Sequence, residues 1–178
     1  LTLGNTTALG TGVLTNNAAV NVASGITAIT ANGLAGTTTG ASFSLSNLAT
    51  TPIAVALSIV QGSDTTYLGT LTGLGSITKS GSAVLTLSGQ NTYTGNTTVN
   101  SGTLTAGIST VGSSYGAFGI GSNIIVNGGT LALGAFNETV GSVRIDTNGG
   151  SITSTTGILT GTSYTLANTS PNTASISA

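Results

Sequence analysis

The sequence of 178 residues contains no cysteine, histidine, methionine or tryptophan, and only 3% of it is charged. Without cysteine, disulfide-stapled scaffolds and thiolate metal sites are excluded. Without histidine, mechanisms that need an imidazole as general base are excluded. One lysine and one arginine are too few to line a groove that neutralises phosphates, so we expect no nucleic-acid partner.

Long apolar runs are also missing. A transmembrane helix needs about 20 mostly apolar residues, and the longest candidate run, Ile53 to Val60, is far shorter. We therefore expect no membrane-spanning stretch in this segment. No signal peptide is visible and the first residue is Leu1, from which we expect a piece of a longer chain. A mean hydropathy of +0.42 with a net charge of −1 argues against intrinsic disorder.

What the sequence does contain is glycine and small polar residues. There are 28 Gly, 36 Thr, 22 Ser and 15 Asn, together 101 of the 178 residues. The frequent glycines leave little room for helices, whereas branched Thr, Val and Ile fit a pleated strand. The shortage of charge and the abundance of Thr and Asn favour a location outside the cell, extracellular or on the cell surface.

Several short segments alternate between apolar and polar residues, which is typical of half-buried strands. The apolar members that share an inward face are Leu85 and Leu87; Leu131 and Leu133; Val143 and Ile145; and Ile53, Val55, Leu57 and Ile59. Arg144 and Asp146 then face solvent. The segments are separated by glycine- and asparagine-rich turns at 88–91, 127–129 and 148–150. Such turns fit either antiparallel hairpins or the corners of a solenoid.

A longer-range repeat favours the solenoid. Residues 1–25 resemble residues 104–129, with a gap of several residues, and Gly102-Thr103-Leu104-Thr105 is echoed by Gly129-Thr130-Leu131-Ala132. Degenerate periodicity of this kind is typical of folds that add coils along one axis. We expect residues 1–178 to form a single solenoid segment of a longer repetitive chain.

The stretch from Gly75 to Leu104 is more specific. It runs through Lys79, Leu85-Thr86-Leu87-Ser88-Gly89, Asn91-Thr92-Tyr93-Thr94-Gly95, Thr97-Thr98-Val99 and Gly102-Thr103-Leu104. In this order these elements closely resemble the passenger-associated strand repeat of bacterial autotransporters. The resemblance implies an all-β, right-handed parallel β-helix, displayed on the outer surface of a Gram-negative-type cell.

In such a fold, Leu85 and Leu87 are predicted to point inward from one strand, Val99 from the next and Leu104 from the third. That path uses about 20 residues, so the whole chain gives about seven to nine coils stacked about 4.8 Å apart. Like charges in successive coils would lie one above another, which is destabilising. Stacked Thr, Ser and Asn hydrogen-bond instead, which accounts for the near absence of charge.

Two patterns raise the question of catalysis. Gly112-Ser113-Ser114-Tyr115-Gly116 matches a hydrolase nucleophile elbow, but that mechanism needs a base and a following helix, so we expect a loop. Polysaccharide-cleaving β-helices use clustered carboxylates, for which two groups within about 5–10 Å are needed. The candidates are Asp64, Glu138 and Asp146, with Lys79 and Arg144, and Arg144 is expected to pair with Asp146 in solvent. We predict no catalytic residue and keep a β-helical polysaccharide hydrolase or lyase as an alternative.

No cofactor or metal site is predicted either. The Gly-Gly-x-Gly-x-Asp turn of calcium-binding β-rolls is absent, and an isopeptide bond from Lys79 to an asparagine is not expected. The aromatic residues are predicted to cover or plug the core at corners, with a sugar-binding strip of tyrosines as the alternative: Tyr67, Tyr93, Tyr115, Tyr164, Phe43, Phe118 and Phe136. The glycosylation sequons at Asn5, Asn96, Asn137 and Asn168 are expected by chance in so Thr-rich a chain.

The function predicted is therefore that of a non-enzymatic surface protein, a rigid stalk or adhesive fibre segment of an autotransporter-type passenger. The ends at Leu1 and Ala178 carry no charged cap, and a bare strand edge invites pairing. We expect end-to-end stacking on neighbouring repeats or on identical subunits, the latter giving a homopolymeric extracellular filament. The candidate ligands are surface glycans and host receptors, and the sequence does not choose between them.

Overall fold

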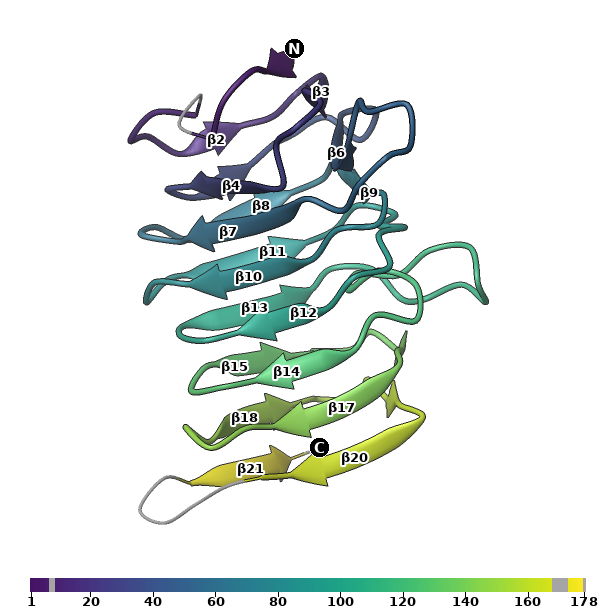
Figure 1. Ribbon diagram of the computed structural model, residues 1–178. Helices are drawn as coiled ribbons and strands as arrows, with labels where there is room; N and C mark the ends of the chain where they lie inside the picture. The colour runs from purple at the N-terminus through teal and green to yellow at the C-terminus, as the bar shows by residue number, and fades with distance from the viewer. Residues whose placement is uncertain (7–8, 168–172, 178) are drawn as a thin grey trace.

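The computed structural model describes residues 1–6, 9–167 and 173–177, and every regular element in these ranges is a strand. The strands stack as a right-handed parallel β-helix of about eight turns, with the two chain ends at opposite ends of the rod (Figure 1). The predicted fold class and number of coils are thereby confirmed.

Two long faces dominate the rod (Figure 1). One is a seven-stranded sheet, in order along the axis β4 (Ala28–Ala31), β7 (Ala56–Val60), β10 (Ile77–Ser80), β12 (Thr97–Val99), β14 (Ile124–Val126), β17 (Ser142–Ile145) and β20 (Ser163–Leu166). The other is six-stranded: β8 (Thr65–Tyr67), β11 (Val84–Leu87), β13 (Thr103–Ala106), β15 (Thr130–Ala132), β18 (Gly150–Thr153) and β21 (Ala174–Ser177). Neighbouring strands in both sheets run parallel.

Shorter sheets form the third side. The first comprises β1 (Thr2–Leu3), β3 (Ala19–Val22), β6 (Ser42–Asn47) and β9 (Thr70–Thr72), and further along the axis β16 (Glu138–Thr139) pairs with β19 (Leu159–Thr160). The pair β2 (Leu14–Thr15) and β5 (Leu34–Ala35) lies beside β8, at the N-terminal end of the six-stranded face. One coil thus passes from the seven-stranded face to the six-stranded face and returns along the third side.

The core is built from aliphatic side chains stacked in register. On the six-stranded face Leu85 pairs with Leu104, Leu104 with Leu131, and Leu131 with Ile152, all of them buried. The outward partners on the same strands are hydroxyl residues such as Thr86 and Thr105. Alternation along each strand therefore decides which side chains fill the interior, as predicted for 85/87, 131/133 and 143/145.

Two details of the predicted packing are wrong. Leu104 does not come from a third strand of the coil; it lies on β13, directly beside Leu85 in the next coil of the same sheet. The chain reaches β13 through a short corner after Val99, so one coil has two long faces and an irregular third side. Ile53 is exposed although Val55, Leu57 and Ile59 are buried, because Ile53 lies in the connection before β7.

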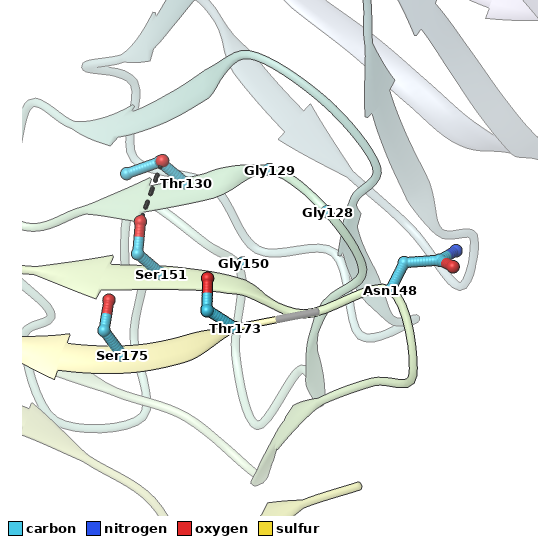
Figure 2. Close-up of a pocket in the computed structure, with 8 residues that line it drawn as sticks. All are labelled: Gly128, Gly129, Thr130, Asn148, Gly150, Ser151, Thr173 and Ser175. Atoms are coloured by element: carbon cyan, nitrogen blue, oxygen red, sulfur yellow. Dashed lines mark hydrogen bonds between the residues drawn. The ribbon is translucent and has the colours of Figure 1, made fainter. Parts of the chain in front are cut away.

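The turns at 127–129 and 148–150 are corners of the solenoid rather than hairpins. Gly128 and Gly149 have φ of +110° and +72°, a region that favours glycine. The Gly128 amide donates to the Gly149 carbonyl, so the two corners are themselves stacked. Figure 2 shows Thr130 and Ser151 following these corners on adjacent strands, with their hydroxyl oxygens 3.0 Å apart.

Candidate functional site

Lys79 is a charged residue that the fold places in the interior. It lies in register between Ile59 and Val99 on the inward side of β10, and its side chain is buried. Its ammonium donates to the carbonyls of Gly81, Ala83 and Ser101 at 2.5–2.9 Å. Burial lowers the pKa of Lys79, while the nearby Asp64 acts in the opposite direction. The lysine thus ties two successive corners together.

The contacts of Lys79 bear on the isopeptide hypothesis. The hydrogen-bond acceptors of the ammonium are backbone carbonyls, whereas an isopeptide bond needs an asparagine side chain at that position. The geometry therefore gives Lys79 hydrogen bonds to backbone carbonyls in place of an isopeptide partner. The inward position was readable from the sequence, since Lys79 is two residues after the apolar Ile77 in an alternating strand.

Glu138 is a second charged residue in the interior. Its side chain is only 1% exposed, at the start of β16. One carboxylate oxygen accepts from the Thr110 hydroxyl at 3.0 Å and from the Phe118 amide at 3.5 Å. The other oxygen is buried without a partner in the described part of the chain. Burial raises the pKa of Glu138 to about 7, although these hydrogen bonds oppose the shift.

Glu138 holds together the base of a projecting loop. The connection between β13 and β14, residues 107–123, extends away from the rod (Figure 1). Thr110 lies near its start and Phe118 near its end, and both contact the same carboxylate. Asn91 closes the base further, because its backbone pairs with that of Gly116 in both directions. The base of the loop is therefore anchored by the buried carboxylate of Glu138 and by the backbone of the buried Asn91.

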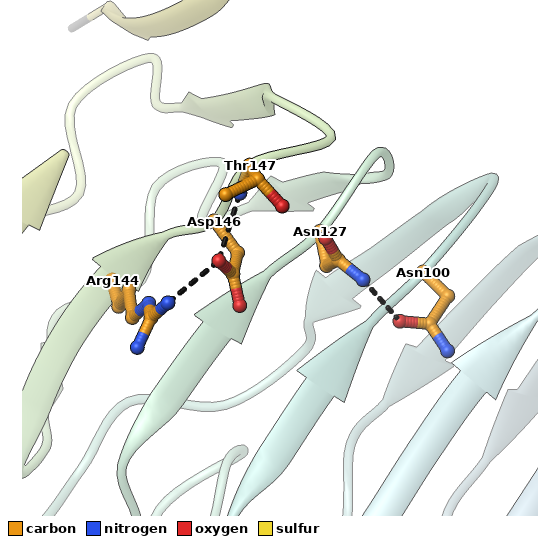
Figure 3. A network of polar contacts seen from close by, with 5 residues as sticks. All are labelled: Asn100, Asn127, Arg144, Asp146 and Thr147. Atoms are coloured by element: carbon orange, nitrogen blue, oxygen red, sulfur yellow. Dashed lines mark hydrogen bonds and ion pairs between the residues drawn. The ribbon is translucent and has the colours of Figure 1, made fainter. Parts of the chain in front are cut away.

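The remaining carboxylates lie elsewhere on the rod. Asp64 precedes β8 and accepts from the Val84 amide at 2.8 Å. Asp146 follows β17 and forms the predicted ion pair with Arg144, 2.7 Å between guanidinium nitrogen and carboxylate oxygen, on the exposed face (Figure 3). Hydrogen bonds from the Thr147 amide and Arg144 lower the pKa of Asp146. In the adjoining coils, Asn127 and Asn100 make the stacked polar contact seen beside this pair, at 3.4 Å.

These positions do not assemble the carboxylate pair that the hydrolase hypothesis requires. Glu138 faces the interior and Asp146 faces solvent, where Arg144 holds it. In the described ranges, no group of three or more acidic, histidine or cysteine side chains that could hold a metal is found. The segment 112–116, which matches a nucleophile elbow, lies in the projecting loop, where the Ser114 amide donates to the Val111 carbonyl. It is a loop, as expected.

The tyrosines divide into two groups. Tyr67 and Tyr93 are fully buried and plug the core, as predicted. Burial raises the pKa of Tyr67 to about 12, with Asn16 donating to its hydroxyl at 2.9 Å, and burial likewise raises the pKa of Tyr93. Tyr164 is 49% exposed on β20. With two of the four inside the rod, the tyrosines do not form one sugar-binding strip.

The predicted sequons are on the surface where they are described. Asn5, Asn96 and Asn137 are exposed, and Asn168 lies outside the described residues. Asn96 accepts a hydrogen bond from the Asn123 side chain at 3.3 Å, and Asn137 accepts from the Ile158 amide at 2.9 Å. Two of these amides therefore already serve as links between coils.

Two polar hollows open on the surface. One, of about 490 Å³, follows the corners in Figure 2 and is lined by Gly128, Gly129, Thr130, Asn148, Gly150, Ser151, Thr173 and Ser175. The other, of about 400 Å³, is lined by Thr39, Leu68, Thr70, Ser88, Gly89, Gln90 and Ile108. No sequence motif pointed to either, because each gathers residues from three or more coils whose spacing is irregular.

Comparison with known proteins finds a similarity in the central coils. Residues 77–106 match the model of the Passenger-associated-transport-repeat family. This stretch of 30 residues is similar to an autotransporter passenger repeat. The match covers β10 to β13, the stretch in which Lys79, Leu85 and Tyr93 carried the predicted resemblance, which is thereby confirmed.

A curated relative extends this similarity. The chain is 36% identical over 121 residues, 62% of its length, to Adhesin BmaC autotransporter of Brucella suis biovar 1 (strain 1330). The chain spans about 3% of the length of that relative. No solved structure matches. No helix with the length and apolarity to cross a membrane is found in the part of the chain that the structure describes.

Proposed function

We propose that the chain is a non-enzymatic segment of a cell-surface adhesive passenger, a rigid length of β-helix that bears or extends an adhesive surface. The observation that carries the proposal is the passenger repeat at 77–106, set within a continuous stack of coils and within 121 residues similar to a protein named as an adhesin. The match spans about 3% of that relative.

The physical properties of the rod suit exposure outside a cell. Parallel pairing from coil to coil satisfies the backbone of the strands on the two long faces, and a core of stacked aliphatic side chains fills the interior. The outer surface carries almost no charge and many hydroxyl and amide groups. Such a surface keeps its hydrogen bonds over a wide range of ionic strength, because screening acts on charges.

The C-terminal end of the rod supports the proposal of end-to-end stacking. Tyr164 and Leu166 on β20 continue the inward ladders of Val143 and Ile145, and Ile176 on β21 continues that of Ile152. Unlike those buried partners they are 49%, 57% and 54% exposed. A further coil laid on this end would bury them. We favour a coil of the same polypeptide over an identical subunit, because the relative is many times longer than this chain.

The proposal is tested in the full-length surface protein that contains this segment. In one strain residues 1–178 are deleted in frame, and in another they are replaced by an unrelated β-helix of equally many coils. Surface display is measured with an antibody to another part of the protein, and attachment to host cells is counted. We expect deletion to reduce attachment at unchanged display. Unchanged attachment after deletion would contradict an adhesive or spacing role.

The replacement strain separates the two halves of the proposal. Attachment restored by unrelated coils indicates a spacer, whereas attachment that stays low indicates that this segment bears the contact. The enzyme alternative is tested with the purified chain and soluble polysaccharides. Release of reducing or unsaturated sugar ends that is lost in Glu138→Gln would support a hydrolase or lyase instead.

A further inference from the structure

We propose that the hollow around Gly89, here called the Gly89 groove, binds a neutral oligosaccharide. The groove is defined by Thr39, Leu68, Thr70, Ser88, Gly89, Gln90 and Ile108 and has a volume of about 400 Å³, within the usual range for small-ligand sites. The inference rests on the proposed adhesive function and gives it a location and a ligand class.

Two glycines stack beside the groove. Gly89 follows β11 by two residues, and in the preceding coil Gly69 follows β8 at the same distance. A Cβ on Gly89 would overlap the carbonyl of Gly69, and a Cβ on Gly69 would overlap the ring of the buried Tyr67. Only glycine allows this close approach. Leu68 and Ile108 line the depression together with Gly89 and the polar side chains.

The polar side chains around this depression have unused hydrogen-bonding capacity. Thr39, Thr70, Ser88 and Gln90 make no side-chain hydrogen bond to any residue that the structure describes. Three hydroxyls donate and accept, and the amide adds two donors and an acceptor. In the hollow of Figure 2, by contrast, Thr130 and Ser151 bond to each other. The Gly89 groove therefore offers the larger share of free polar groups.

Charge and apolar surface select the ligand class. The chain has five charged residues, Asp64, Lys79, Glu138, Arg144 and Asp146, and none of them lines the groove. An anionic ligand would find no cation there and a cationic ligand no carboxylate. Leu68 and Ile108 are partly exposed and present apolar surface beside the hydroxyls. A neutral sugar matches both, because its ring has apolar C–H faces and an edge of hydroxyls.

The experiment measures binding of the 178-residue chain to uncharged hexasaccharides by isothermal titration calorimetry and by amide shifts in NMR spectra. The probes are cellohexaose, maltohexaose and chitohexaose, with hexagalacturonate as the anionic counterpart. We expect at least one neutral probe to bind and to shift the amides of Ser88 and Gln90, and the anionic probe to bind more weakly. Gln90→Ala should weaken binding about three- to tenfold, the effect of one lost neutral hydrogen bond.

Thr39→Trp, at an exposed position on the rim, should fill the groove and abolish binding. The matched control is Thr66→Ala, an exposed hydroxyl on the outer side of β8 away from the groove. It should bind as the unmodified chain does, and urea melts of all variants should coincide.

Three results would overturn the proposal: no binding of any neutral probe, equal binding of hexagalacturonate, or binding unaffected by Thr39→Trp. Its failure is distinguishable from failure of the adhesive function. Attachment that requires residues 1–178 but survives Thr39→Trp in the full-length protein leaves the adhesive role in place and removes the groove from it.

Discussion

At the scale of single residues, the fold depends on which face of a strand a side chain occupies. Leu87 is fully buried on β11 while its neighbour Thr86 lies on the outer side, in register with Thr66 and Thr105. The two positions are adjacent in sequence, yet one has an apolar environment and the other has solvent. A charge placed at each of them therefore meets opposite surroundings.

We predict that Leu87→Asp unfolds the coils around it, at a cost of several kcal/mol, because an unpaired carboxylate would enter an apolar interior. Thr86→Asp should lower the free energy of unfolding by less than about 1 kcal/mol, since the new charge faces water. Urea denaturation of both variants is the measurement. Equal losses at the two positions would show that the assignment of faces is wrong.

Glu138 makes stability depend on pH. Its pKa is raised from 4.5 to about 7 in the folded chain, so the neutral form is the one that the fold favours. The stabilising contribution is complete below pH 4.5 and is lost as the pH rises through 7. Tyr93, which also faces this group, stays protonated over that range because its own pKa is raised.

We expect Glu138→Gln to abolish most of this pH dependence and to raise the free energy of unfolding at pH 9 by about 3 kcal/mol relative to the unmodified chain. The amide retains an acceptor oxygen for Thr110 and carries no charge. Urea melts between pH 4 and pH 9 give the comparison, with Asp146→Asn on the surface as control. A Glu138→Gln variant that loses stability as steeply as the unmodified chain between pH 5 and pH 8 would contradict the buried-acid account.

The positions of the buried charges Lys79 and Glu138 follow from the sequence, but the contacts that stabilise them do not. Glu138 stands two residues before the buried Val140, and Lys79 two residues after the buried Ile77. The alternation that places the leucines inward therefore also places these charges inward. A charged side chain ordinarily prefers the surface of a protein. Inside the rod, three carbonyls accept from the Lys79 ammonium, and groups at the base of the projecting loop donate to the Glu138 carboxylate. Ser101 for Lys79, and Thr110 and Phe118 for Glu138, come from neighbouring coils, so the sequence around each charge does not contain these contacts.

At the scale of elements, the corners and connections decide how many strands make up one coil, which the strands alone do not show. The strands were predictable from alternation, and the corners at 127–129 and 148–150 from glycine and asparagine. The number of strands in a coil was not, because a short corner and a longer third side look alike in sequence. Leu104 was accordingly assigned to a third strand, although the chain had already returned to the six-stranded face. For the same reason the projecting loop at 107–123 was predicted only in its segment 112–116.

Lys79 provides the prediction at this scale, since its ammonium links the corner after β10 to the corner after β12. Lys79→Met keeps an unbranched side chain of similar length and leaves the three carbonyls without their charged donor. We expect a loss of about 2 kcal/mol, because the removed desolvation cost offsets part of the lost hydrogen bonds. Amide hydrogen exchange should accelerate around Ala83 and Ser101, whereas Thr78→Ala, with its side chain outward on the same strand, should change neither quantity. Unchanged exchange at both corners in Lys79→Met would contradict the linking role.

At the scale of the whole molecule, the described part of the rod exposes apolar side chains at its C-terminal end. Tyr164, Leu166 and Ile176 continue the core ladders into solvent, so the isolated chain should associate through that end. Leu166→Lys together with Ile176→Lys should shift sedimentation-velocity profiles toward monomer at equal protein concentration. The matched control, Leu48→Lys with Leu74→Lys, changes exposed leucines along the side of the rod and should leave association unchanged. A monomeric unmodified chain at high concentration would contradict stacking at this end.

The central claim is that successive coils add along one axis, and distances between outward residues of the seven-stranded face test it most directly. Thr30 is separated from Thr98 by three strand steps, from Arg144 by five and from Thr165 by six. Spin labels on cysteines introduced in pairs at these positions should give backbone separations of about 14, 24 and 29 Å, a linear increase of about 4.8 Å per coil. Pulsed electron–electron double resonance measures the two longer distances, and dipolar broadening of the continuous-wave spectrum measures the shortest. Distances that do not increase with coil number, as in an antiparallel sandwich, would contradict the account.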